Sequence, residues 1–239
     1  MTESQVTDGL SIIPDEDGNV TNLYTRRQTD DLTIVRDRSL YERRFKRPFD
    51  VIVGSGAAVV AAPLAAVIAV GIRLGLGKPI LYQQERIGEG GETFTIYKFR
   101  TMRPDRRQKV VELPVGQDRR NGHKAYDDPR HTGLGRRLRQ LSLDELPQII
   151  NVLRGDMSLV GPRPEIPEVA DERGYRDHIR HVAKPGMTGP YQTSDLRLNG
   201  DLRDGLHVDA EYVFNISLKN DVRYVLRTAK VLLTRGTGS

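Results

Sequence analysis

The sequence predicts a mixed α/β fold that is mostly helical and contains one membrane-inserted helix. Two observations lead to this prediction. An uncharged apolar stretch, Val51–Ile72, lies between basic flanks near the N-terminus. A charge-rich segment follows, with one strand-like pattern and several helix-like patterns. We therefore expect a membrane helix joined to a small polar domain that contains a short β-hairpin and amphipathic helices.

The chain divides into three expected parts. Residues 1–40 are polar and contain several Asp- and Gly-rich turns, so we expect them to be disordered or loosely ordered. Residues 41–77 contain a basic juxtamembrane segment and the apolar helix. Residues 78–239 form the polar domain.

Composition favours an anionic partner and excludes several kinds of site. The net charge is +5, which suits acidic lipid headgroups, phosphorylated substrates or nucleic acid. Cysteine is absent, so disulfides and thiolate metal sites are excluded. The chain has no tryptophan and 6% aromatic residues, which weakens a nucleic-acid interpretation based on base stacking.

The apolar stretch Val51–Ile72 is long enough to cross a bilayer but has features of a broken helix. As a straight helix it would measure about 33 Å, against a hydrocarbon core of about 30 Å. Pro63 removes one helical hydrogen bond near the middle and should kink the helix. Basic residues flank both ends, and such residues prefer the cytoplasmic side. A re-entrant helix, a spanning helix and a buried core helix all remain open.

Residues 80–102 alternate apolar and polar side chains around a Gly88–Gly91 turn, which predicts a β-hairpin. Residues 103–130 are polar and contain prolines and glycines, so we expect an insertion or a mobile loop.

Three later segments have helical patterns. Leu134–Leu141 and Ser142–Leu153 are both expected to be helices. Asp221–Arg235 has apolar residues on one face and basic residues mostly elsewhere, which fits either an interfacial amphipathic helix or a docked surface helix.

Asp144 and Glu145 are the central candidates for chemistry. Arginines surround them in the sequence, and a carboxylate beside bound phosphates usually meets them through a divalent cation such as Mg²⁺. The alternative is structural. Ser142 through Glu145 matches a capping box, in which Glu145 bonds back to the Ser142 backbone N–H.

The run Gly161–Pro164 presents one arginine, Arg163, in a rigid frame. Prolines fix φ on either side, and a fixed guanidinium suits bidentate phosphate binding. The alternative is a turn with a solvated arginine. Lys98 closes the hairpin and Lys184 begins a turn; either cation could bind phosphate or simply be solvated.

Five motifs together resemble one family. They are Lys46–Asp50, Ile96–Met102, Ser142–Gln148, Gly155–Pro164 and Lys184–Gly189. In this order they closely resemble the bacterial sugar transferases, monotopic polyprenyl-phosphate phosphoglycosyltransferases that start exopolysaccharide, O-antigen and related glycans. The likeness runs from about Lys46 to Leu233.

The resemblance implies a topology and a set of roles. It implies a re-entrant membrane helix hairpin broken at Pro63, with a small catalytic domain on the cytoplasmic face of the inner membrane. It implies that Asp144 is the nucleophile and the Mg²⁺ ligand and that Glu145 supports acid–base chemistry. It also implies phosphate contacts at Lys98, Arg139 and Arg163.

The implied reaction transfers a phosphosugar from a nucleotide-diphosphosugar to a polyprenyl phosphate of the undecaprenyl type. The expected donor is a UDP-sugar. It would pass through a phosphosugar-aspartyl intermediate and release a nucleoside monophosphate. Two rival interpretations are a membrane-tethered basic adaptor for anionic lipid and a nucleic-acid-binding protein. The adaptor would not need Asp144, and the low aromatic content counts against the nucleic-acid-binding protein.

Overall fold

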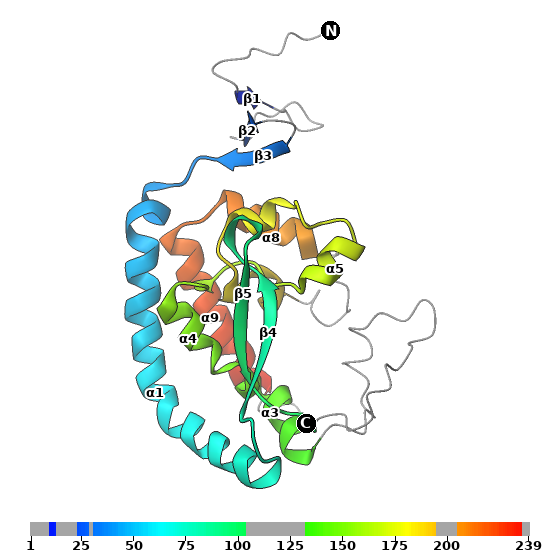
Figure 1. Cartoon of the computed structure of the whole chain (residues 1–239). Helices are drawn as coiled ribbons and strands as arrows, with labels where there is room; N and C mark the ends of the chain where they lie inside the picture. Colours follow the sequence, from blue (N-terminus) through cyan, green and yellow to red (C-terminus); the bar gives the residue numbers. More distant parts are fainter. Residues whose placement is uncertain (1–9, 13–22, 29–30, 104–131, 195–204, 236–239) are drawn as a thin grey trace.

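The computed structural model describes residues 10–12, 23–28, 31–103, 132–194 and 205–235 (Figure 1). The elements follow in chain order: β1 (Leu10–Ile12), β2 (Leu23–Gln28), β3 (Asp31–Arg36), η1 (Tyr41–Phe45), α1 (Lys46–Gly75), β4 (Leu81–Ile87), η2 (Glu89–Gly91), β5 (Thr93–Phe99), α3 (Gly133–Gln140), η3 (Leu143–Glu145), α4 (Gln148–Arg154), β6 (Ser158–Val160), α5 (Pro167–Glu172), η4 (Ile179–Val182), β7 (Gly186–Thr188), α6 (Pro190–Thr193), α8 (Leu206–Phe214) and α9 (Leu218–Arg235).

Three short strands lie within the first forty residues. They form an antiparallel sheet in the order β1-β2-β3. These strands lie within the segment that was predicted to be disordered or loosely ordered. The run Leu32–Val35 contains consecutive β-branched residues, which favour extended backbone despite the polar surroundings. Residues 1–9, 13–22 and 29–30 of this segment, and the predicted insertion at 103–130 apart from Arg103, lie outside the described residues.

Helix α1 is continuous through Pro63 and visibly bends along its length (Figure 1). Together with η1 it is long and apolar enough to cross a membrane, and only 11% of its most apolar window is buried. This exposure argues against the core-helix alternative, because a core helix buries most of its surface. Large apolar side chains remain exposed along the helix, among them Ile52, Val59, Val60, Leu64, Val67 and Val70.

The N-terminal end of α1 is hydrogen-bonded to the polar domain. The Arg47 guanidinium donates to the carbonyls of Val152 and Leu153 at 2.5 and 2.7 Å, which are last-turn carbonyls of α4. The Asp50 carboxylate accepts from the Ser158 hydroxyl and the Leu159 N–H, both at 3.0 Å. Arginine at a helix C-terminus also interacts favourably with the helix dipole.

A buried group of polar side chains completes this attachment; we call Tyr41, Lys46, Tyr212 and Asp221 the anchor cluster. The Lys46 ammonium donates to the Asp221 carboxylate at 2.7 Å and to the Val160 carbonyl at 3.1 Å. The hydroxyls of Tyr41 and Tyr212 donate to the same carboxylate at 2.8 and 2.7 Å. The Asp221 side chain is 0% exposed, so the cluster joins the start of α1 to α9 inside the protein.

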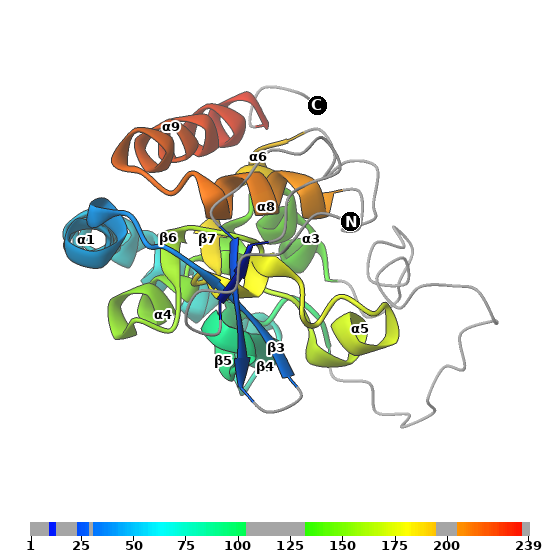
Figure 2. The ribbon, with the colours of Figure 1, turned by 90° about the horizontal axis from the view of Figure 1, so that it is seen from above.

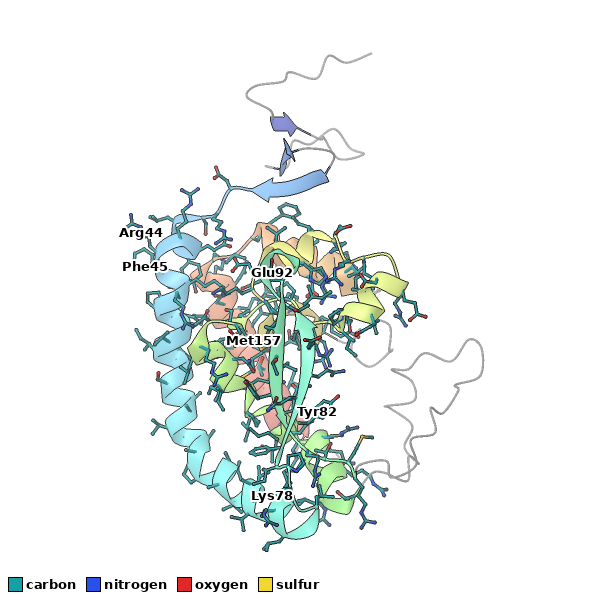
Figure 3. All side chains as sticks on the ribbon, in the orientation of Figure 1. Arg44, Phe45, Lys78, Tyr82, Glu92 and Met157 are labelled. Carbon is teal, nitrogen blue, oxygen red and sulfur yellow. The ribbon has the colours of Figure 1, made fainter. Side chains whose placement is uncertain are left out.

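The C-terminal end of α1 contacts the same domain. Ile68 and Ile72 are buried against Phe99 and Leu138. The Arg100 guanidinium donates to the carbonyls that follow the helix, those of Leu76, Gly77 and Lys78, at 2.5, 3.0 and 3.1 Å. Figure 3 labels Phe45 just before α1 and Lys78 just after it, and the domain lies along one side of the helix.

The predicted hairpin is confirmed as β4 and β5, which pair antiparallel from Leu81↔Phe99 to Ile87↔Thr93. A side chain from α4 closes the free edge of β5. The Asn151 amide oxygen accepts from the Tyr97 N–H at 3.1 Å, and its NH₂ donates to the Thr95 carbonyl at 2.7 Å. Asn151 therefore fixes α4 against the strand that carries Lys98.

The predicted helix at Leu134–Leu141 is confirmed as α3, whereas the single helix predicted for Ser142–Leu153 is wrong. Ser142 has a left-handed backbone with φ of 56°, and the chain then forms a 3₁₀ turn before α4 begins at Gln148. Pro147 lacks an N–H and cannot continue a helix from the preceding turn, which explains the break. Asp144 and Glu145 therefore lie on a short turn between two helices.

Strands β6 and β7 pair in parallel at the centre of the main core. The core contains Ile96, Val152, Met157, Leu159, Val160, Ile179, Ala183, Tyr212, Val213 and Ile216. Figure 2 shows α9 on the outer side of α8. Helix α9 packs Tyr224 and Val225 onto the core and exposes Leu218, Val222 and Leu226, so it docks on the domain and still presents an apolar stripe.

Candidate active site

A small pocket lies where the β4–β5 hairpin, the Leu143–Glu145 turn and the Gly161–Pro164 loop meet. Its charged lining consists of three cations and one carboxylate, namely Arg86, Lys98, Arg163 and Glu145. The remaining lining residues are Ile96, Gln148, Pro164, Gly186, Met187 and Gln192. We call this the cationic pocket.

Glu145 faces the pocket and does not cap a helix. The Ser142 side chain makes no capping hydrogen bond, so the capping-box alternative is wrong. The Glu145 carboxylate instead accepts from the Lys98 ammonium at 2.7 Å, and the Arg163 guanidinium lies 3.9 Å from the same oxygen. Strand β5 and the Gly161–Pro164 loop thus each bring a cation to this carboxylate.

Asp144 is half-buried beside this pair. Burial, and next the negative charge of Glu145, raise the pKa of Asp144 to about 6, while Lys98 and Arg139 oppose the rise. An ordinary aspartate has a pKa near 3.9. At neutral pH the group is still mostly ionised, but its anion is less stabilised than in water. A carboxylate in this condition suits a nucleophile, because forming a covalent bond removes the disfavoured charge.

The Gly161–Pro164 loop is fixed by backbone contacts to β7. The Gly161 N–H donates to the Thr188 carbonyl at 2.9 Å, and the Gly186 N–H donates to the Pro162 carbonyl at 2.8 Å. A Cβ atom on Gly161 would collide with the Lys184 carbonyl oxygen, so only glycine permits this approach. The loop therefore presents Arg163, whose side chain is 38% exposed, at the pocket.

A buried ion pair supports the loop from behind. The Arg180 guanidinium donates to the Arg163 carbonyl at 2.5 Å and lies 2.8 Å from the Asp209 carboxylate. Both side chains are 0% exposed. Burial raises the pKa of Asp209 to about 6 although Arg180 acts to lower it, so the pair is held by its packing as well as by its charges.

The structure brings four of the predicted site residues together: Lys98, Asp144, Glu145 and Arg163. The fifth, Arg139, donates from Nε to the Thr101 hydroxyl at 2.9 Å and is close enough to lower the pKa of Asp144. Pro63 lies in α1, and its side chain is exposed. Lys184 has a structural partner, since its ammonium donates to the Gly155 carbonyl at 2.8 Å.

Arg86 is a pocket residue that the sequence analysis missed. The strand register pairs Arg86 with Phe94 and Tyr82 with Lys98. Since side chains alternate between faces with a period of two, Arg86 and Lys98 share one face of the hairpin. The alternation within residues 80–102 was the signal that could have identified it.

The described part of the chain contains no group of three or more histidine, aspartate or glutamate side chains that could hold a metal ion by themselves. Asp144 and Glu145 are two adjacent carboxylates at the pocket. A metal at this position would need oxygen ligands from a substrate as well.

The sequence profile described as bacterial sugar transferase matches residues 41–235. The chain belongs to this family. It is 38% identical over 200 residues to an undecaprenyl-phosphate galactose phosphotransferase of Salmonella typhimurium, with 81% of this chain and 41% of the relative covered.

Two further relatives are covered more completely. The chain is 39% identical over 203 residues to a UDP-glucose:undecaprenyl-phosphate glucose-1-phosphate transferase of Caulobacter vibrioides, covering 79% of this chain and 70% of the relative. It is 36% identical over 198 residues to an exopolysaccharide production protein of Sinorhizobium fredii, with 80% of this chain and 87% of the relative covered. The chain thus spans about two-fifths of the first relative's length and most of the length of the other two.

Proposed function

We propose that this chain transfers a phosphosugar from a nucleotide-diphosphosugar to a membrane polyprenyl phosphate. The observation that carries the proposal is the half-buried Asp144 carboxylate beside a pocket with three cations. The names of the relatives support it, because they specify undecaprenyl phosphate as acceptor and, in one case, UDP-glucose as donor. The product would be a polyprenyl-diphosphosugar, the first lipid-linked unit of an exopolysaccharide or a similar glycan.

In the first step a carboxylate oxygen of Asp144 attacks the phosphorus that carries the sugar. A P–O bond forms to Asp144, and the bond to the bridging oxygen breaks. The bridging oxygen leaves with the electron pair as part of the nucleoside monophosphate. The phosphosugar remains attached to Asp144 as an acyl phosphate.

In the second step a phosphate oxygen of the polyprenyl phosphate attacks the same phosphorus. The new P–O bond gives the lipid diphosphosugar, and the Asp144 carboxylate leaves in its original state. Glu145, held by Lys98 at 2.7 Å, lies where it can accept the proton of a singly protonated lipid phosphate.

The cations around Asp144 neutralise the charge of the transferred group. Arg163 is offered by a rigid loop and can bind two phosphate oxygens at once. Lys98 and Arg139 both act electrostatically on Asp144, so they lie near the position of the reacting phosphorus.

Mg²⁺ fits this arrangement if the protein and the substrate both supply oxygen ligands to the ion. Magnesium usually takes only one or two protein carboxylates and completes its shell with water and substrate phosphates. Asp144 would supply the protein oxygen. When bound, the ion would neutralise phosphate charge at the reacting centre.

The contacts of α1 favour a re-entrant topology, and the basic residues on both flanks of the helix favour the cytoplasmic face for the domain. The helix is hydrogen-bonded or packed to one domain at both of its ends, through Arg47 and Asp50 at the start and Ile68 and Ile72 at the end. A domain that lies on one side of a membrane can contact both ends only if both lie on that side. The bend and the exposed apolar middle agree with a helix that enters and returns. Cytoplasmic nucleotide sugars then reach the pocket directly.

The reaction order is tested by supplying the nucleotide sugar without lipid. A panel of nucleotide sugars is incubated with the full chain in detergent, and nucleoside monophosphate is measured by rapid quench. We expect a burst of up to one equivalent per protein with the correct donor, followed by steady turnover once polyprenyl phosphate is added. Asp171→Asn changes an exposed acid outside the pocket and should keep the burst. Release that begins only with lipid would show direct transfer without an aspartyl intermediate.

The topology is tested with single cysteines at Arg44 and Lys78, two exposed positions on either side of α1 (Figure 3). The chain has no cysteine of its own, so labelling has no background. We expect both positions to be protected from an impermeant thiol reagent in intact cells and labelled after lysis. Labelling of position 44 alone in intact cells would show a spanning helix. Pro63→Leu should straighten α1 and shift some molecules toward that form.

A further inference from the structure

We infer that Arg86 and Arg163 together form a two-guanidinium site for a substrate phosphate group. The inference rests on the proposed function and deepens it by adding Arg86, a residue outside the five predicted site positions. The ligand class is a phosphate or diphosphate oxyanion. The nucleotide sugar and the polyprenyl phosphate both carry this chemistry, and the experiment below separates them.

Arg86 is fixed in place yet incompletely bonded. Its Nη2 donates to the Gln84 side-chain oxygen at 2.7 Å, and its Nη1 lies 3.4 Å from the Pro164 carbonyl oxygen. The side chain is 13% exposed. Its Nε is buried and has no hydrogen-bond partner among the described residues. A buried donor without a partner costs free energy, so a ligand oxygen that reaches this guanidinium would be stabilised.

The nearest acid pairs with Arg86 by charge but without a hydrogen bond. The Glu165 carboxylate lies 3.8 Å from Nη1, which is too far for a hydrogen bond. Its oxygens already accept from the Ile166 N–H at 2.9 Å and the Tyr175 hydroxyl at 3.1 Å. A purely structural arginine would be expected to pair closely with this acid.

The cationic pocket concentrates like charge. Burial, and next the positive charge of Arg163, lower the pKa of Arg86 to about 10, although Glu165 acts to raise it. Holding two guanidinium groups near each other at a partly buried site is unfavourable without an anion. Glu145 is the one carboxylate in the pocket lining, and it is already bonded to Lys98. A bound phosphate would relieve the repulsion between the two arginines.

The two arginines approach the pocket from different elements. Arg86 lies on β4, and Arg163 lies on the Gly161–Pro164 loop. The carbonyl of Pro164, the residue after Arg163, faces the Arg86 guanidinium, so the loop contacts both arginines. Each guanidinium presents a planar fork that matches phosphate oxygens. Lysine has no such fork, so Arg86→Lys keeps the charge but loses the geometry.

The kinetic test compares Arg86→Gln and Arg86→Lys with wild type in the full chain, varying each substrate in turn. We expect the KM of one substrate to rise about ten- to one-hundred-fold in Arg86→Gln, the usual range for a lost charged hydrogen bond, with a smaller rise in Arg86→Lys. A rise confined to the nucleotide sugar identifies its diphosphate as the ligand, and a rise confined to polyprenyl phosphate identifies the lipid. Unchanged KM values for both substrates in both variants would overturn the site.

A matched control is Arg154→Gln. Arg154 contacts the same hairpin through the Tyr97 hydroxyl at 2.9 Å but does not line the pocket. It should leave both KM values within about twofold of wild type, as for an exposed contact. Equal KM increases in Arg154→Gln and Arg86→Gln would show a general disturbance of the hairpin and would overturn the site.

A binding readout separates this inference from the proposed reaction. Inorganic diphosphate is titrated while thermal unfolding is followed, which needs no turnover. We expect it to stabilise wild type and Asp144→Asn but neither Arg86→Gln nor Arg163→Gln. That pattern would keep the phosphate site even if no donor were turned over. Equal protection of Arg86→Gln and wild type would refute the site. If Arg86→Gln does not fold, Arg86→Lys decides, since equal protection of that variant and wild type refutes the site.

Discussion

The anchor cluster and the cationic pocket both place charged side chains in partly or fully buried positions, and they differ in how those charges are balanced. In the anchor cluster one carboxylate, Asp221, receives three donors and is 0% exposed. In the cationic pocket the charged lining consists of three cations and one carboxylate, and Arg163 remains 38% exposed. The first arrangement is complete without a ligand, and the lining of the second contains more cations than carboxylates.

This difference separates residues that hold the fold from residues available for chemistry. Breaking a fully buried pair leaves an uncompensated charge, so the loss appears in stability. Changing a half-exposed residue in a pocket allows water to compensate, so the loss appears in substrate binding or turnover. The following predictions are ordered from the largest expected effect to the smallest.

The largest effect is expected from Asp144→Asn, which should lower turnover at least about a thousandfold while the unfolding midpoint stays close to wild type. An amide cannot act as the carboxylate nucleophile. Nucleoside monophosphate release and a thermal melt of the same preparation measure both quantities. Near-normal release by protein free of wild-type enzyme would contradict the nucleophile assignment.

Lys46→Met should destabilise the protein by about 3–5 kcal/mol, because Asp221 would remain buried without its cation. The matched change is Lys98→Met in the cationic pocket, where the partners are 17% and 23% exposed. We expect it to cost about 1 kcal/mol or less in stability but to lower activity strongly. Unfolding of both variants in detergent, followed by circular dichroism, checks the contrast. Equal destabilisation would remove the distinction between the two regions.

Arg163→Lys should lower kcat/KM. The loss corresponds to about 1.5–3 kcal/mol of transition-state stabilisation, because a point charge cannot replace the bidentate fork. Stability should change little, since the loop is held by backbone contacts and by Arg180. Steady-state kinetics with both substrates varied measure the effect. Kinetics equal to wild type would return Arg163 to the role of a solvated turn residue.

Tyr212→Phe should have the smallest effect, about 1–2 kcal/mol in stability. It removes one hydroxyl donor from Asp221 but leaves Lys46 and Tyr41 in place. Activity per folded molecule should be unchanged. A loss of activity without a loss of stability would mean that the anchor cluster also affects the active site.

The sequence was sufficient for features that depend on neighbouring residues. The β4–β5 hairpin followed from alternation around a glycine turn, and the candidate roles of Asp144 and Arg163 followed from local motifs and a family resemblance. Local reasoning also produced the wrong capping box, because Ser142 through Glu145 has the right letters, while the left-handed backbone at Ser142 prevents the cap.

Features that depend on distant residues were not predictable. The alternation in the hairpin could place Arg86 on the face of Lys98, but its position in the pocket depends also on the approach of Pro164, which is 78 residues away. The pairing of Lys46 with Asp221 and of Arg180 with Asp209 requires the folded arrangement of α8 and α9 around the core. The proline in α1 suggested a kink, but the contacts that bring both helix ends to one domain lie in other elements.

The Lys46–Asp221 pair can form only late in the synthesis of the chain. The two residues are separated by 175 positions in the chain. At roughly 5–20 residues per second, about 9–35 s pass between the synthesis of the lysine and that of its partner. Throughout this interval the ammonium group lacks its Asp221 partner, and Asp50 on the same helix is the acid whose pKa its charge lowers. The Lys46–Asp221 link therefore forms only after nearly every element of the active site has been synthesised, whereas the contacts of Arg47 and Asp50 with residues 152–159 can form earlier.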